Sequence, residues 1–243
     1  MKTYEYLKNK IEKEGCIHLT LIDPAFDSEK NIKIIKEAES AGTSGIMVGG
    51  SYNTIETDET IKKIKSSTNL PVIIFPGNVH DVSKNADAIF FLSMLNSRNT
   101  YYISQVQALS SCMIKRAGIE PISIAYVVFE PGMTVGFVGD ANLIRRQKPE
   151  IAVGYALSAE FTGYKFVYFE AGSGADAPIP IEAVELMRKA CKIHLIVGGG
   201  IKNAETAEKY SKAGANIIIT GTMGEQIDNF SSELKKLINA IKR

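Results

Sequence analysis

Carboxylates stand at the ends of three apolar, β-rich runs, and each is followed within two residues by Pro or Gly: Asp23, Glu130 and Glu170. Glu170 comes two residues before Gly172-Ser173-Gly174, a turn whose glycines lack a Cβ and tolerate positive φ. Backbone N–H groups in such a turn can approach an anion closely. We therefore predict that Glu170 lies at a strand end beside a bound anion. An ordinary tight turn with a solvated glutamate is the alternative.

Two further glycine-rich turns follow later apolar runs, at Gly198-Gly199-Gly200 and at Thr220-Gly221-Thr222. Asn203 can cap the helix that would begin after the first of them. In (β/α)8 barrels the loops after the seventh and eighth strands often form a phosphate site from backbone N–H groups and a helix N-terminus. Together with Gly172-Ser173-Gly174, these turns could surround one phosphate. The alternative is that the glycines only permit tight turns.

A second polar corner is predicted after the first two apolar runs, where Asp23 and the turn Gly49-Gly50-Ser51 stand. One carboxylate and one hydroxyl make a poor cage for a metal held by protein alone. They suit Mg²⁺, which takes its remaining ligands from water and substrate phosphates. Asp23 and Ser51 are therefore candidate Mg²⁺ ligands, and a cap or turn role for Asp23 before Pro24 is the alternative. Glu130 has no assignable role beyond contact with a substrate.

The elements that must position these residues follow a repeating strand-then-helix pattern. The predicted strands are 17–22, 45–48, 71–75, 88–92, 122–129, 165–169, 194–197 and 216–219. The predicted helices are 4–13, 28–41, 54–67, 101–116, 150–162, 181–191, 204–213 and a last one from about Glu225. Eight alternating units favour an α/β fold of the TIM type, a closed (β/α)8 barrel, over an open sheet. No linker is visible, so we expect one domain over residues 1–243.

Two intervals depart from this rhythm. Only about twelve residues separate the third and fourth strands, close to the minimum of roughly ten to twelve for a complete crossover with its helix. We therefore predict that the barrel lacks a regular third helix, counting the helix that follows each strand. After the fifth strand, Glu130-Pro131-Gly132 opens an irregular segment to about Asp140, which is a candidate cover for an active site.

The composition is that of an ordinary soluble globular protein, with 243 residues, 45% hydrophobic, 23% charged and a net charge of +1. This balance gives no electrostatic reason to expect nucleic-acid binding, although the basic last helix could touch an anionic membrane surface. The sequence shows no signal peptide and no apolar run approaching 18 residues, and its three distant cysteines are typical of reduced thiols. We expect a cytoplasmic protein.

The three histidines show no metal-ligand spacing. His18 and His194 fall at strand starts, on the side of a barrel opposite the active site, so we expect structural roles for both. His80 lies in the loop after the third strand and could reach a ligand, but no neighbouring residue supports that role.

Five motifs together resemble the geranylgeranylglyceryl phosphate synthase family, the archaeal ether-lipid prenyltransferases. They are Leu21-Ile22-Asp23-Pro24, Met47-Val48-Gly49-Gly50-Ser51, Tyr168-Phe169-Glu170-Ala171-Gly172-Ser173-Gly174, Val197-Gly198-Gly199-Gly200-Ile201 and Thr220-Gly221-Thr222. The glycine triplet is shared by many phosphate-binding barrels, whereas the long run around Glu170 combined with Asp-Pro after the first strand is specific. The resemblance covers essentially the whole chain, and residues 101–164 resemble the larger of the family's two groups.

The resemblance implies Mg²⁺-dependent transfer of a geranylgeranyl group from its diphosphate to the C3 hydroxyl of sn-glycerol 1-phosphate. Asp23 and Ser51 would hold the metal, and Glu170, with Tyr168 as the second catalytic residue, would orient the acceptor hydroxyl and take its proton. The residues implied to bind glycerol phosphate are Tyr168, Phe169, Glu170, Ala171, Gly172, Ser173, Gly174, Gly199, Gly200, Gly221 and Thr222. The resemblance also implies a barrel without a regular third helix and a homo-oligomer, either a dimer or a hexamer.

Other functions stay open at this point. Relatives in bacteria use a longer heptaprenyl donor, and the choice depends on what blocks an apolar groove. Four residues could line that groove or fill the barrel core: Phe90, Phe91, Met94 and Leu95. An isomerase, epimerase or lyase acting on a sugar phosphate would also use the phosphate site, and a catalytically silent phosphate-binding barrel would need neither Asp23 nor Glu170.

Overall fold

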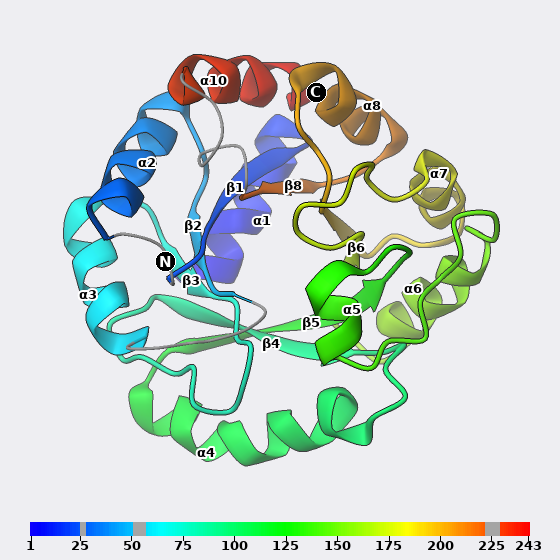
Figure 1. Cartoon of the computed structure of the whole chain (residues 1–243), viewed down its shortest axis with the longest axis horizontal. Coiled ribbons are helices and arrows are strands. Elements are labelled where there is room, and N and C mark those ends of the chain that lie inside the picture. The colour runs from blue at the N-terminus through cyan, green and yellow to red at the C-terminus, as the bar shows by residue number, and fades with distance from the viewer. Residues whose placement is uncertain (25–27, 51–56, 222–228) are drawn as a thin grey trace.

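The computed structural model describes residues 1–24, 28–50, 57–221 and 229–243. Eight parallel strands form a closed barrel in sequence order, and helices surround it (Figure 1). The strands are β1 (Ile17–Ile22), β2 (Ile46–Val48), β3 (Val72–Ile74), β4 (Ala88–Met94), β5 (Glu120–Val128), β6 (Phe166–Glu170), β7 (His194–Gly198) and β8 (Ile217–Thr220). The predicted (β/α)8 barrel is therefore confirmed.

Among the described helices, one precedes β1 and the others lie in the connections after strands. They are α1 (Thr3–Glu14), α2 (Ser28–Ala41), α3 (Thr57–Ser67), α4 (Val106–Ala117), α5 (Met133–Val138), α6 (Ile151–Phe161), α7 (Ile181–Ala190), α8 (Ala204–Ala213) and α10 (Phe230–Ile241). A π-helical turn, η1 (Tyr101–Gln105), leads into α4, where the sequence predicted one regular helix. None of the described helices is long and apolar enough to cross a membrane.

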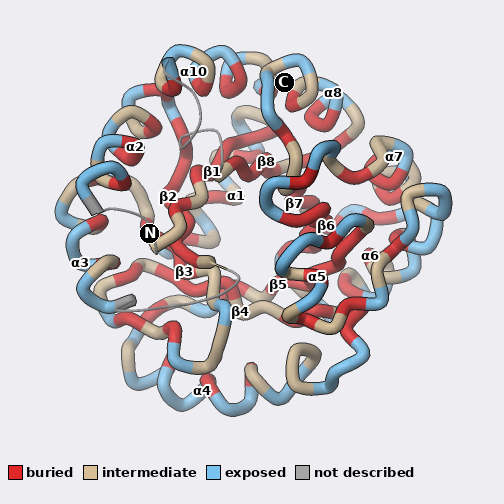
Figure 2. The backbone as a smooth tube through the Cα atoms, in the orientation of Figure 1, coloured by how far each residue is buried: buried red, intermediate tan, exposed pale blue. Residues whose placement is uncertain are grey.

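Alternating residues of the strands divide the core into two layers. On β1, Ile17 and Leu19 belong to the cluster inside the barrel, whereas Ile22 belongs to the cluster between strands and helices. Leu7 and Ile11 of α1 pack against the inner cluster, so α1 closes the end at which the strands begin. Figure 2 shows buried backbone around the whole barrel and exposed positions on the outer helices. The opposite rim, where all strands end, is the one that holds active sites in this fold.

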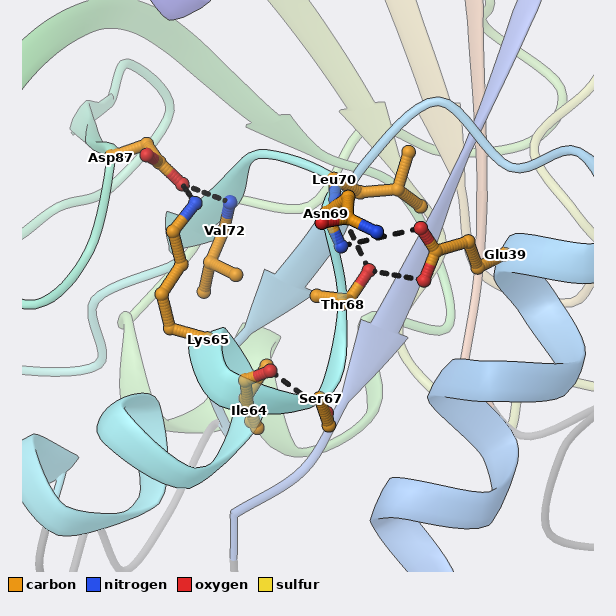
Figure 3. Close-up of polar contacts among 9 residues, drawn as sticks. All are labelled: Glu39, Ile64, Lys65, Ser67, Thr68, Asn69, Leu70, Val72 and Asp87. Atoms are coloured by element: carbon orange, nitrogen blue, oxygen red, sulfur yellow. Dashed lines mark hydrogen bonds and ion pairs between the residues drawn. The ribbon is translucent and has the colours of Figure 1, made fainter.

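The third βα connection has no helix, as predicted. Residues 75–87 between β3 and β4 are all described and contain only turns and irregular backbone. The Asp81 carboxylate organises this loop by accepting hydrogen bonds from the backbone N–H groups of Gly77 (2.8 Å) and Asn78 (2.9 Å). Where the loop enters β4, Asp87 accepts from Lys65 Nζ (2.5 Å) and from the N–H of Val72 (2.7 Å), as Figure 3 shows.

The segment after β5 is more ordered than the sequence predicted. Instead of irregular backbone throughout residues 130–140, it contains the short helix α5, whose N-cap Gly132 has a φ of 73°. Hydrogen bonds attach this segment to the ends of the neighbouring strands: Gly132 N–H donates to Ala171 O (3.0 Å), the hydroxyl of Ser97 donates to Gly139 O (2.6 Å), and Arg98 N–H donates to Asp140 O (2.9 Å). In Figure 1, α5 lies in front of the barrel, over the strands on the side of β5 and β6.

Candidate active site

Glu170 is the last residue of β6, and its carboxylate is held at both oxygens. Tyr168 Oη donates to Glu170 Oε2 (2.6 Å), and the backbone N–H of Gly172 donates to Glu170 Oε1 (2.6 Å). Positions 168 and 170 share the inner face of the barrel because side chains alternate along a strand. Only 6% of Glu170 is exposed. The carboxylate therefore has one orientation, at the rim where a ligand would enter.

Burial and hydrogen bonding shift the pKa of Glu170 in opposite directions. Burial raises the pKa of Glu170, and the hydrogen bonds from Tyr168, Gly172 and Ala171 lower that pKa in part. Burial and the neighbouring Glu170 charge hold the pKa of Tyr168 well above its usual range, and the same two causes raise the pKa of Tyr126. Tyr168 therefore stays protonated and donates, while Glu170 is a more basic carboxylate than one in water.

The predicted glycine turns after β6, β7 and β8 meet around one cavity beside Glu170. The cavity is lined by Leu21, Tyr168, Glu170, Ser173, Gly174, Gly199, Gly200, Ile201, Ile219, Thr220 and Gly221. Gly199 has a φ of 78°, and a Cβ at this position would lie 2.2 Å from Glu170 Oε1 and 2.8 Å from the backbone N of Gly172. The approach of the turns after β6 and β7 therefore requires glycine at position 199. We call this cavity the glycine cradle.

Not every predicted contact residue lines the glycine cradle. Phe169 points to the outer face, where its ring packs on Phe129 with centroids 5.4 Å apart. Ala171 is fully buried in the same outer cluster. Thr222 lies outside the described residues. Asn203 caps α8 as predicted, because its side chain accepts from the N–H of Thr206 (2.8 Å).

Of the second predicted corner, the structure describes Asp23 and Gly50, which lie close together where β1 and β2 end. A Cβ at Gly50 would lie 3.0 Å from both carboxylate oxygens of Asp23, so the acid of one strand end rests against the turn of the next. Ser51, the other predicted ligand, lies outside the described residues. Within the described ranges no group of three or more His, Cys, Asp or Glu could hold a metal. The Asp23 carboxylate is a hard oxygen ligand of the kind that Mg²⁺ takes, and the remaining coordination positions would go to water and to substrate phosphates.

An aromatic cluster beside Glu170 was not identified from the sequence. The rings of Phe75, Tyr126 and Tyr168 pack inside the barrel, with centroids 5.6 Å apart for Phe75 and Tyr126 and 4.9 Å for Tyr126 and Tyr168. Phe75 directly follows β3, and Tyr126 lies on β5, opposite Tyr168 in the strand register. Strand alternation would have placed Tyr126 inside the barrel, but its depth there depends on the register with β6.

An apolar groove runs along β4 where the third helix is missing. It is lined by Pro76, Gly77, Asn78, Val82, Ile89, Phe90, Phe91, Leu92, Tyr102, Val106, Gln107, Ser110 and Ile114. Phe90 and Phe91 therefore contact this groove, although the Phe90 ring also packs on Phe75 inside the barrel. Met94 belongs to the inner core and Leu95 packs against the outer one. We call this feature the β4 groove.

The remaining polar candidates do not line the glycine cradle. His18 is buried on the outer face of β1, and His194, at the start of β7, packs its ring near Phe166. His80 is exposed in the loop after β3. Glu130 accepts a hydrogen bond from the N–H of Arg146 (3.2 Å), which gives it a contact within the protein.

The chain is similar to known proteins over its whole length. Residues 8–241 match the model of the PcrB family. The chain is 46% identical to geranylgeranylglyceryl phosphate synthase of Methanococcoides burtonii, with all of both chains covered. It is 43% identical to the (S)-3-O-geranylgeranylglyceryl phosphate synthase of Thermoplasma acidophilum, whose crystal structure contains the substrate sn-glycerol-1-phosphate. The TM-score of that pair is 0.95, with 100% of this chain and 99% of the other covered. The chain belongs to the PcrB family.

Proposed function

We propose that this protein transfers a geranylgeranyl group from geranylgeranyl diphosphate to the C3 hydroxyl of sn-glycerol 1-phosphate. Full-length relatives at 46% identity carry the name of this synthase. The observation that carries the proposal is the position of Glu170, a buried carboxylate fixed by Tyr168 and Gly172 at the edge of the glycine cradle. A silent binding barrel would have no use for a buried, more basic carboxylate at this place.

The glycine cradle would hold the acceptor by its phosphate. Backbone N–H groups of glycine turns suit a phosphate because they approach it closely and carry partial positive charge. Glu170 Oε2 or Oε1 would then accept a hydrogen bond from the C3 hydroxyl. In the reaction this hydroxyl oxygen attacks C1 of the prenyl chain, the C1–O bond to diphosphate breaks with its electron pair leaving on diphosphate, and the proton passes to Glu170. Holding the nucleophile in line is the main contribution of the cradle.

The donor would lie between the Asp23 corner and the β4 groove. Asp23, with Ser51, would hold Mg²⁺, which neutralises charge on the leaving diphosphate. The aromatic rings of Phe75, Tyr126 and Tyr168, which pack together beside Glu170, would stabilise the positive charge that develops on an allylic carbon. The apolar walls of the β4 groove, which include Phe91, would accept the hydrocarbon chain.

A direct assay tests the proposal. The purified protein is incubated with Mg²⁺, geranylgeranyl diphosphate and sn-glycerol 1-phosphate, and diphosphate release is followed together with the mass of the product. Release that requires both substrates supports the proposal. Faster turnover with heptaprenyl diphosphate would assign the longer donor. No release with either donor would contradict a prenyltransferase, and sugar phosphates would then be tested for isomerisation or cleavage.

Two proposals about partners accompany this function. A homo-oligomer, a dimer or a hexamer, is implied by the family resemblance, and the mass of the protein in solution measured by light scattering tests it. The basic residues of α10 and the chain end favour a peripheral contact with anionic membranes: Lys235, Lys236, Lys242 and Arg243. Co-flotation with anionic but not neutral vesicles would support this contact, and the absence of co-flotation would contradict it.

A further inference from the structure

A polar network outside the active site joins the two ends of the barrel. His18 lies on β1 with 1% of its surface exposed, and its ring points outward because its neighbours Ile17 and Leu19 fill the inner core. His18 Nδ1 lies 2.9 Å from Thr43 Oγ1, in the connection between α2 and β2. On the other side, His18 Nε2 lies 3.0 Å from Thr220 Oγ1, at the end of β8.

The neighbouring bonds determine which ring nitrogen carries the proton. The Thr43 hydroxyl has one proton, and the backbone O atoms of His18 (3.1 Å) and Gly45 (3.4 Å) both lie within its reach as acceptors. With that proton on a backbone carbonyl, Thr43 Oγ1 accepts from His18 Nδ1–H, and it also accepts from the Thr20 hydroxyl (3.2 Å). The unprotonated Nε2 then accepts from the Thr220 hydroxyl. Burial lowers the pKa of His18 to about 3, which agrees with a neutral ring.

Thr220 connects this network to the glycine cradle. It is the last residue of β8, it lines the cradle, and it immediately precedes Gly221. Its backbone is paired with Thr20 of β1, and its hydroxyl lies 3.0 Å from His18 Nε2. The hydroxyl bond therefore fixes the side chain of a residue whose main chain forms one wall of the cradle.

We infer that His18 is a positioning residue for the phosphate site. Through Thr220 it holds the end of β8 so that the backbone around Gly221 faces the phosphate of sn-glycerol 1-phosphate. This inference rests on the proposed function. An apolar side chain would fill the same buried space without the desolvation cost of an imidazole. What the histidine adds is a ring that bonds to Thr43 through one nitrogen and to Thr220 through the other. The ring acts through Thr220 and does not touch the substrate.

Substitutions that keep or remove the acceptor toward Thr220 test this role. His18→Asn keeps an N–H near the Nδ1 position but cannot reach Thr220, and Thr220→Val removes the hydroxyl with little change in volume. Both should weaken sn-glycerol 1-phosphate binding by about three- to tenfold, the effect of one lost hydrogen bond. The KM for this substrate should rise equally, while kcat and the KM for the prenyl diphosphate stay constant. His18→Gln and Thr220→Ser, which restore the acceptor and the hydroxyl, should recover most of the affinity.

Calorimetric titration with sn-glycerol 1-phosphate, together with melting temperatures, separates the outcomes. His194→Gln is the matched control, because the His194 ring lies at the start of β7. The affinity of this variant for sn-glycerol 1-phosphate should equal that of the wild type. Loss of affinity in His18→Asn and Thr220→Val, with recovery in the two conservative variants, supports the inference. Wild-type affinity in Thr220→Val, or equal loss in Thr220→Ser, overturns it whether or not His18→Asn folds. A wild-type protein that binds no glycerol phosphate instead contradicts the proposed function.

Discussion

Glu170 combines features that are costly for a folded protein and useful for catalysis. Its carboxylate is buried beside Tyr168, and hydrogen bonds from Tyr168 and from the backbone of Gly172 and Ala171 compensate only part of the lost hydration. A carboxylate that served only to close a turn would be more stable in solvent. The burial raises its pKa and so its strength as a base, which is what abstraction of a hydroxyl proton requires.

Glu170→Gln keeps the shape of the side chain and removes the base. Because general-base help contributes roughly 10²- to 10⁴-fold, we expect kcat at saturating substrates to fall within that range. The affinity for sn-glycerol 1-phosphate should change much less, since the cradle binds the phosphate through backbone groups. Glu130→Gln, at the next strand end, is the control and should keep most of the activity. A Glu170→Gln enzyme with full kcat would remove this residue from the mechanism.

The pH dependence follows from the raised pKa of Glu170. The base must be ionised, so kcat/KM should decline as the pH falls through this raised pKa. Tyr168→Phe removes the hydrogen bond that lowers the pKa, and the acid limb should therefore move to higher pH. Rate profiles of both proteins measured between pH 4 and about pH 9 test this. An acid limb that stays in place, or moves to lower pH, would contradict the assignment of Glu170 as the base.

The same shift has a consequence for stability. The pKa of Glu170 in the folded protein lies above the unfolded value of 4.5, so its protonation contributes to the free energy of unfolding. This contribution is fully present below the unfolded pKa and is lost as the pH rises through the folded-state pKa. The wild type should therefore lose stability relative to Glu170→Gln as the pH increases through that window. Chemical denaturation at several pH values measures the difference. A difference between the two proteins that does not change with pH would argue against the burial penalty.

Asp23 is the described carboxylate at the proposed Mg²⁺ site. Asp23→Asn keeps the side chain's size and removes its charge, so we expect a higher Mg²⁺ concentration for half-maximal rate and a higher KM for the prenyl diphosphate. Binding of sn-glycerol 1-phosphate should not change. Titration of Mg²⁺ at fixed substrate concentrations gives this result, and an unchanged Mg²⁺ requirement would exclude Asp23 as a ligand.

At the scale of elements, the turn after β7 fixes how closely the strand ends approach. Gly199→Ala would place a Cβ 2.2 Å from Glu170 Oε1 and also strain a φ of 78°. Gly163→Ala is a control for the backbone strain alone, because Gly163 has a φ of 81° and a Cβ there meets nothing within 4 Å. Gly163→Ala should lose about 1 kcal/mol of stability from the backbone strain. Gly199→Ala should lose more, because its Cβ also clashes with Glu170 and Gly172, and only this variant should abolish glycerol phosphate binding. Equal binding by the two variants would contradict a role of the close approach.

The elements show where prediction from the sequence succeeds. Most strand positions were predictable because short β-rich runs end at Pro or Gly. The absence of a third helix followed from the small number of residues between the third and fourth strands. Helix α5 was not predictable because it is only six residues long and depends on contacts of Gly132 with Ala171. Phe169 was placed with the phosphate contacts by resemblance to a motif, although strand alternation turns its side chain to the outer core. Tyr126 was missed because no turn marks its position.

At the scale of the whole molecule, the closed barrel brings distant parts of the sequence to one rim. The pairing of β8 with β1, from Ile17–Ile217 to Thr20–Thr220, sets the last glycine turn beside the first strand. The glycine cradle and the Asp23 corner are therefore neighbours although about 150 residues or more separate Asp23 from the turns after β6 to β8. Because no helix follows β3, the β4 groove lies between β4, the loop after β3 and α4 of the same barrel.

A crystal structure with sn-glycerol 1-phosphate tests the central claim most directly. The account predicts that the phosphate accepts hydrogen bonds from backbone N–H groups of the glycine cradle and that the C3 hydroxyl lies within hydrogen-bonding distance of the Glu170 carboxylate. A phosphate bound outside the cradle, or a C3 hydroxyl turned away from Glu170, would contradict it.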